Sequence, residues 1–121
     1  MSQREKTILV VDDEPDILLI LEAVFTYDGY RVLTASTGER LFSLLARERP
    51  DLILLDMLLS GADGRELTRK LKGQETTARI PVLMISAHPR AEQEALAAGA
   101  DGFLAKPFSL KEILGRVETY W

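Results

Sequence analysis

Five polar side chains of this sequence lie at the ends of short apolar runs, where the chain could present them for chemistry: Asp12, Asp13, Asp56, Ser86 and Lys106. Three carboxylates gathered in one crevice repel one another, and one would normally be forced to hold a proton. The aspartates carry −3 and the lysine +1, which leaves −2, the charge that one divalent cation neutralises. Hard oxygen ligands without histidine or cysteine favour Mg²⁺. The set therefore predicts a magnesium site suited to phosphoryl transfer.

Each of these side chains could take a defined part in such a transfer. A carboxylate such as that of Asp56 can act as the nucleophile and form an acyl phosphate. Catalysis then depends chiefly on positioning and on neutralising the charge spread over the phosphoryl oxygens. We expect Mg²⁺ to hold one phosphoryl oxygen, the Lys106 ammonium a second and the Ser86 hydroxyl a third.

The apolar runs that precede these residues predict buried strands. The runs are continuous rather than alternating, which is typical of strands that are covered on both faces. Four are clear and a fifth is weaker: residues 8–11, 52–55, 82–85 and 103–105, and then residues 31–35.

Helical patterns separate the predicted strands. Pro15 can open the first helix and Thr37 can cap the second. Ser109 and Glu112 form a capping-box pattern at the start of the fifth helix. Gly99 is placed to end the fourth helix. The third and fourth helices are expected over residues 66–72 and 91–98.

Strand and helix alternate five times along the chain, which predicts an α/β fold with a parallel sheet and helices on both faces. The order of the strands cannot be read from periodicity. In any order, the carboxyl ends of parallel strands lie at one edge, and the functional crevice of such sheets lies beyond that edge. The five polar side chains should therefore meet in one crevice.

The composition predicts one domain outside the membrane. The 121 residues suit a single domain over residues 1–121, and the lack of cysteine excludes disulfides and thiolate metal sites. The apolar runs are too short to span a bilayer or to form a signal-peptide core. A net charge of −4 without a basic stripe argues against direct nucleic-acid binding. We expect a cytoplasmic protein.

Five segments of the sequence resemble the response-regulator receiver family of two-component signalling: residues 8–15 (ILVVDDEP), 51–57 (DLILLDM), 61–64 (GADG), 80–87 (IPVLMISA) and 99–108 (GADGFLAKPF). They occur in order and span almost the whole chain. The resemblance implies a flavodoxin-like, doubly wound sheet of five parallel strands in the order 2-1-3-4-5, with five helices. It implies that a phosphohistidine on a sensor histidine kinase or a histidine phosphotransfer protein phosphorylates Asp56. It also implies a signalling switch rather than a turnover enzyme.

The resemblance assigns the metal ligands as well. Asp13, Asp56 and the backbone carbonyl of Met57 would bind Mg²⁺, for which Mn²⁺ could substitute. Asp12 would help, partly through water. The peptide bond before Pro107 is expected to be cis, since X-Pro is the one common context for a cis bond.

A switch pair follows from the same resemblance. The Ser86 hydroxyl would move to the phosphoryl group while the Phe103 ring turns inward. The face formed by the fourth helix, the fifth strand and the fifth helix would then change its affinity for a downstream target or an output domain. The chain is expected to be a monomer or a phosphorylation-dependent dimer.

Three positions bear on how this chain differs from the usual pattern. Ser60 stands where many family members have proline, which should loosen the turn after Asp56 but remove no chemistry. Leu58 and His88 occupy positions that tune the loss of the phosphoryl group in the family. An apolar Leu58 cannot orient an attacking water, so a long-lived phosphorylated state is expected.

Ordinary structural roles remain open for several of these residues. Asp13 could simply cap a helix, Ser86 could bond nearby backbone, and Phe103 could be a core aromatic. His88 is the single histidine, and one histidine makes neither a metal site nor a phosphorelay. We expect it to be a solvated loop residue.

Two other functions compete with the signalling switch. A small Mg²⁺-dependent phosphohydrolase would also use an aspartate nucleophile, but such enzymes usually carry Asp-x-Asp after the first strand, whereas this chain has Asp12-Asp13-Glu14. A protein-binding scaffold could keep the fold without accepting phosphate, and the intact acidic set argues against it.

Overall fold

Five parallel strands form one sheet in the order β2-β1-β3-β6-β7. The computed structural model describes residues 6–88 and 90–121. In chain order, the strands of the sheet are β1 (Thr7–Val11), β2 (Arg31–Ala35), β3 (Leu52–Asp56), β6 (Val82–Ser86) and β7 (Gly102–Ala105). Counted without a small hairpin, the order is 2-1-3-4-5, so the flavodoxin-like fold expected from the sequence is confirmed.

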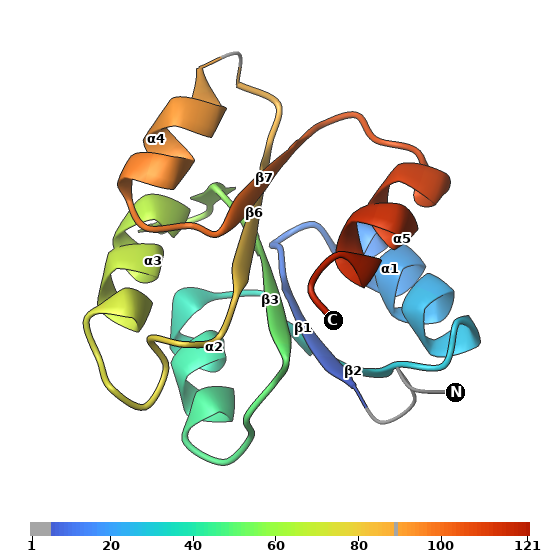
Figure 1. Cartoon of the computed structure of the whole chain (residues 1–121), viewed down its shortest axis with the longest axis horizontal. Helices are drawn as coiled ribbons and strands as arrows, with labels where there is room; N and C mark the ends of the chain where they lie inside the picture. Colours follow the sequence, from blue (N-terminus) through green and yellow to red (C-terminus); the bar gives the residue numbers. More distant parts are fainter. Residues whose placement is uncertain (1–5, 89) are drawn as a thin grey trace.

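Helices cover both faces of the sheet (Figure 1). One face carries two helices and the other three: α1 (Pro15–Tyr27) and α5 (Leu110–Glu118), then α2 (Gly38–Leu45), α3 (Gly64–Lys72) and α4 (Ala91–Ala97). Every residue of β1, β3 and β6 is buried, because these strands have helices above and below them. Their sequences are therefore apolar without alternation. In the part of the chain that the structure describes, no helix combines the length and the apolarity that a bilayer crossing requires.

Successive side chains of a strand enter opposite cores, as the two-residue repeat of a strand requires. In β1, Ile8 and Val10 pack in the core beneath α1 and α5, whereas Leu9 and Val11 pack in the core beneath α2, α3 and α4. The two cores clamp the central strands from both sides. The residues at the strands' carboxyl ends are thus held in fixed positions.

The helix starts agree with the capping signals of the sequence. Pro15 lies in the first turn of α1, and the Thr37 side chain accepts a hydrogen bond from the Arg40 backbone N–H at the start of α2. At α5, Ser109 and Glu112 form the expected capping box. The third helix begins at Gly64 rather than at residue 66, because Asp63 caps it.

A two-stranded antiparallel hairpin follows β3, and the sequence did not predict it. Its strands are β4 (Leu58–Leu59) and β5 (Ala62–Asp63), joined by a turn in which Gly61 has a φ of 74°. Glycine adopts this left-handed conformation without a steric penalty. The hairpin connects the end of the central strand β3 directly to α3.

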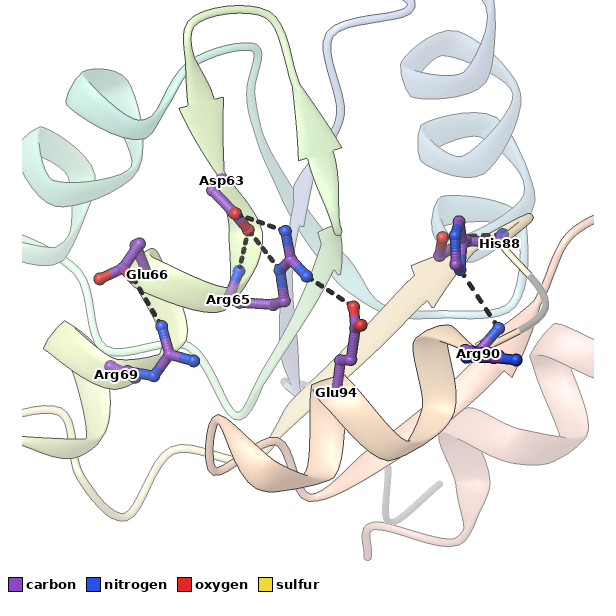
Figure 2. A network of polar contacts seen from close by, with 8 residues as sticks. Asp63, Arg65, Glu66, Arg69, His88, Arg90 and Glu94 are labelled. Atoms are coloured by element: carbon purple, nitrogen blue, oxygen red, sulfur yellow. Dashed lines mark hydrogen bonds and ion pairs between the residues drawn. The ribbon is translucent and has the colours of Figure 1, made fainter.

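Arg65, in the first turn of α3, links this hairpin to α4, as Figure 2 shows. Arg65 donates to both carboxylate oxygens of Asp63 at 2.9 and 2.7 Å, and its third nitrogen lies 2.5 Å from a Glu94 oxygen on α4. The hydrogen bonds from Arg65 lower the pKa of Asp63. Because all three side chains are partly exposed, the link fixes geometry more than it adds stability.

Gly64 lies where the chain leaves the hairpin, and we expect Gly64→Ala to destabilise the protein by about 1–3 kcal/mol. A Cβ at this position would lie 2.6 Å from the Asp56 carbonyl oxygen and 2.9 Å from the Met57 Cα, and both are backbone atoms that cannot turn away. Urea unfolding of the two proteins measures the difference.

Gly115 provides the matched control, because a Cβ there would meet nothing within 4 Å on the exposed side of α5. Gly115→Ala should raise stability slightly, by up to about 1 kcal/mol, since alanine is the better helix former. Equal effects of the two substitutions would show that the close approach at Gly64 is unimportant.

Candidate functional site

Three carboxylates meet at the carboxyl edge of the sheet. Asp12 and Asp13 follow β1, and Asp56 is the last residue of the neighbouring strand β3. Each residue offers one oxygen, and these oxygens all lie within 4.8 Å of one another. The crevice expected from the strand ends is therefore present, and its oxygen donors fit a hard divalent cation.

Lys106 reaches the same carboxylates from the end of the edge strand β7. It follows β7, and its Nζ lies 3.5 Å from an Asp12 oxygen and 3.6 Å from an Asp56 oxygen. Burial by itself lowers the pKa of Lys106, but the charges of Asp12 and Asp56 outweigh burial and raise it. The side chain is therefore a fixed ammonium beside the acidic cluster.

Asp56 has the most perturbed carboxylate of the cluster. Burial, and then repulsion from Asp12, raise its pKa to about 6, while Lys106 and the Leu58 backbone N–H act against them. The loss of hydration on burial is the larger cause and the Asp12 charge adds to it, so the ionised form of Asp56 is disfavoured in the metal-free site. A bound cation would favour the ionised form.

The other two carboxylates are held by backbone donors. The Glu14 N–H donates to Asp12 at 2.9 Å, and the Ser60 N–H donates to Asp13 at 2.7 Å. Bonds from the Ser60 backbone, and then from its hydroxyl, lower the pKa of Asp13. Asp13 does not cap α1, whose N-cap is Glu14 without a side-chain bond. Ser60 does more than loosen the turn, because its amide binds the acidic cluster.

The residues that follow Asp56 in the chain divide between backbone and side-chain roles. The Met57 carbonyl accepts a hydrogen bond from the Gly64 N–H at 2.6 Å, which leaves its second lone pair for another partner. The Leu58 side chain is 59% exposed beside the site.

The Lys106–Pro107 peptide bond, just after β7, is cis, as the resemblance implied.

Ser86, the last residue of β6, is buried at the same edge of the sheet. Its hydroxyl oxygen accepts a hydrogen bond from the His88 N–H at 3.1 Å. His88 in turn accepts one from the Arg90 N–H through Nδ1 at 3.2 Å, just before α4 (Figure 2). His88 is exposed, as expected of a loop residue.

Phe103 is half-buried on β7 and packs against the core beneath α2, α3 and α4. In the sheet it pairs with Met84, two residues before Ser86 on β6. The ring is therefore part core residue and part surface residue.

Comparison with known proteins identifies the family. The sequence profile of the response regulator receiver domain matches residues 8–118. The chain belongs to this family. The receiver domain is 38% identical over 116 residues to the phosphate regulon transcriptional regulatory protein PhoB of Pseudomonas aeruginosa, a match that covers 94% of this chain and 51% of that protein. The chain thus spans about half the length of that curated relative.

Two further relatives cover nearly the same length as the receiver domain. Sporulation initiation phosphotransferase F of Bacillus subtilis is 35% identical over 93% of this chain and 91% of that protein. The crystal structure of the receiver domain of a Pseudomonas aeruginosa sensor histidine kinase, with a magnesium ion coordinated in its active site cleft, superposes with a TM-score of 0.87 at 32% identity. The superposition covers 96% of this chain and 97% of the sensor kinase's receiver domain. The receiver domain is therefore a phospho-accepting module of two-component signalling.

Replacing Asp56 should stabilise the metal-free receiver domain in a pH-dependent way. The folded-state pKa, about 6, lies above the usual aspartate value of 3.8, so folding favours the protonated acid, and this contribution is lost as the pH rises through 6. At neutral pH, the free energy of unfolding of Asp56→Asn should exceed that of the parent by on the order of 1–2 kcal/mol, once solvent screening is allowed for. The gain should shrink toward about pH 4.

Thermal unfolding in a chelator, at several pH values, measures this difference. Asp28→Asn is a suitable control, because it makes the same carboxylate-to-amide change at an exposed position after α1. A parent that is the more stable protein at neutral pH would contradict the raised pKa of Asp56.

Proposed function

We propose that Asp56 is the phosphoacceptor of this receiver domain and that Mg²⁺ bound beside it supports the transfer. The observation that carries the proposal is the cluster itself: three carboxylate oxygens within 4.8 Å, with the Lys106 ammonium 3.6 Å from Asp56. Asp13, Asp56 and the Met57 carbonyl would bind the cation, with help from Asp12. When bound, the cation neutralises charge on the carboxylates and on a phosphoryl oxygen.

In the transfer, an Asp56 carboxylate oxygen attacks the phosphorus of a phosphohistidine. The new O–P bond forms as the N–P bond breaks, and the imidazole leaves with the electron pair. The attack requires the ionised carboxylate, and a pKa of about 6 leaves most Asp56 ionised at neutral pH. Lys106 is already held at bonding distance from Asp12, so it can follow the charge onto the phosphoryl oxygens without a large rearrangement.

Ser86 connects the phosphoryl group to α4. Its oxygen accepts the His88 N–H, and a hydroxyl that accepts in this way can still donate its own hydrogen to a phosphoryl oxygen. Movement of this hydroxyl would pull on the segment that leads through His88 and Arg90 into α4. We infer that the face formed by α4, β7 and α5 thereby changes its affinity for a downstream partner, with Phe103 turning inward on β7.

The phosphodonor, a sensor histidine kinase or a histidine phosphotransfer protein, must bring its histidine to this edge of the sheet. An apolar groove of about 500 Å³ opens there, and Lys106 lines it, so the groove and the acidic cluster share a residue. The other lining residues come from α1, from the loops after β6 and β7 and from the start of α5: Ile17, Ile20, Leu21, Ala87, Pro107, Phe108 and Leu110. We assign this groove to an apolar helix face of the phosphodonor.

A signalling switch fits this site better than a turnover enzyme or a silent scaffold. Turnover requires rapid hydrolysis of the phosphorylated aspartate, and the side chain next to the site at Leu58 is apolar. A scaffold has no need of three buried or half-buried carboxylates around one ammonium, since such charges destabilise a fold unless they are used.

The receiver domain should gain one phosphoryl group when it is incubated with Mg²⁺ and a small phosphodonor such as acetyl phosphate. Intact-protein mass spectrometry measures the gain. Asp56→Asn should gain none, and a chelator should abolish labelling of the parent. An unlabelled parent would favour the scaffold, and a labelled Asp56→Asn would place the phosphoacceptor elsewhere.

The phosphorylated protein should decay slowly, because the exposed Leu58 side chain cannot orient a water for attack on the phosphorus. Leu58→Gln places an amide there and should shorten the lifetime by about threefold or more. His88→Ala provides the comparison at the second tuning position. Decay of the parent within a few seconds would contradict this prediction.

A further inference from the structure

The turn of the β4–β5 hairpin lies against the acidic cluster and bonds to one of its members. The backbone N–H of Ser60 donates to an Asp13 oxygen at 2.7 Å, across 47 residues of sequence. A carboxylate has two oxygens, so this bond holds one of them and leaves the other for a cation. The turn therefore fixes the orientation of a candidate metal ligand.

Asp13 is the carboxylate of the cluster that most needs such support. Asp56 is buried at the end of the central strand β3, and Asp12 is buried with bonds from the Glu14 N–H and Lys106. Asp13 is only half-buried and lies on the segment between β1 and α1. The Ser60 N–H is the donor that joins its side chain to the hairpin.

The Ser60 amide is itself held in place by the hairpin. The β4–β5 pairing fixes the turn, and Leu59, the residue before Ser60, is buried. At the base of the hairpin, the Gly64 N–H bonds to the Met57 carbonyl, and Asp63 caps α3 and pairs with Arg65. The amide is thus presented by an ordered turn.

We propose that the Ser60 backbone N–H is a positioning group for Mg²⁺, holding Asp13 in its ligand orientation before the cation arrives. Preorganisation of this kind strengthens binding because less side-chain freedom is lost when the ligand engages. The donor is a backbone group that every residue except proline supplies. The inference rests on the proposed function, since it assumes that the cluster binds Mg²⁺.

Isothermal titration calorimetry with magnesium chloride tests the inference with three proteins. Ser60→Pro deletes the N–H and should weaken Mg²⁺ binding by about fivefold, less than a fully buried bond to a charged group would give, because this bond is exposed. Ser60→Ala keeps the N–H but removes the hydroxyl, which has the smaller of the two effects on Asp13, so it should bind within about twofold of the parent. An unchanged affinity in Ser60→Pro would overturn the inference, and so would an equal loss in Ser60→Ala.

A backbone ester at position 60, made with the α-hydroxy acid analogue of alanine, deletes the same N–H without a proline ring. It should match Ser60→Pro in Mg²⁺ affinity, and an ester that binds like Ser60→Ala would overturn the assignment to the amide. Thermal unfolding in a chelator should give similar melting temperatures for these proteins, although their Mg²⁺ affinities differ. A merely structural role of the amide would lower the melting temperature and the Mg²⁺ affinity together. A parent that binds no Mg²⁺ would overturn the proposed function as well. If the parent binds Mg²⁺, a failed prediction for the variants would overturn only the role of the Ser60 amide.

Discussion

Mutual repulsion among three carboxylates at one edge of a parallel sheet is the constraint on which the rest of the site depends. Lys106 compensates part of the charge, at 3.5 Å from Asp12 and 3.6 Å from Asp56. Burial, and then repulsion from Asp12, raise the pKa of Asp56 to about 6, so Lys106 does not cancel the Asp12 repulsion at this carboxylate. A protein that keeps such repulsion is destabilised by it unless a cation or another partner uses it. The electrostatics therefore favour a site built to receive positive charge.

The sheet must be rigid for this repulsion to persist, since loose side chains would simply move apart. Rigidity comes from burial on both faces: every residue of β1, β3 and β6 is inside, and alternate side chains enter two separate cores. Parallel strands also bring their carboxyl ends to one edge, so residues from distant segments converge. Packing on both faces of the sheet thus holds the carboxylates together against their mutual repulsion.

The sequence predicted the parts of the structure that follow from burial and periodicity. Continuous apolar runs located the central strands, and the residues at their ends located the cluster. The β4–β5 hairpin was missed because strands of two residues, such as Leu58–Leu59, have no readable period. The Ser60–Asp13 bond was missed for a different reason: its donor is a backbone amide, which any residue but proline provides, so no side-chain pattern reports it.

The structure also indicates why α4 is the element most able to respond to the site. It is the shortest of the five helices among the described residues, and its buried side chains, Ala91 and Ala95, are small. Small side chains bury little apolar area, so packing holds α4 less firmly than it holds α1 or α5. Two polar links also reach α4: the bond from Arg65 to Glu94, and the path from Ser86 through His88 to Arg90 at its start. One link begins in the first turn of α3, where Arg65 also pairs with Asp63, and the other begins at the end of β6. Since α4 contributes only two small side chains to the buried core, displacing it would disturb little apolar packing.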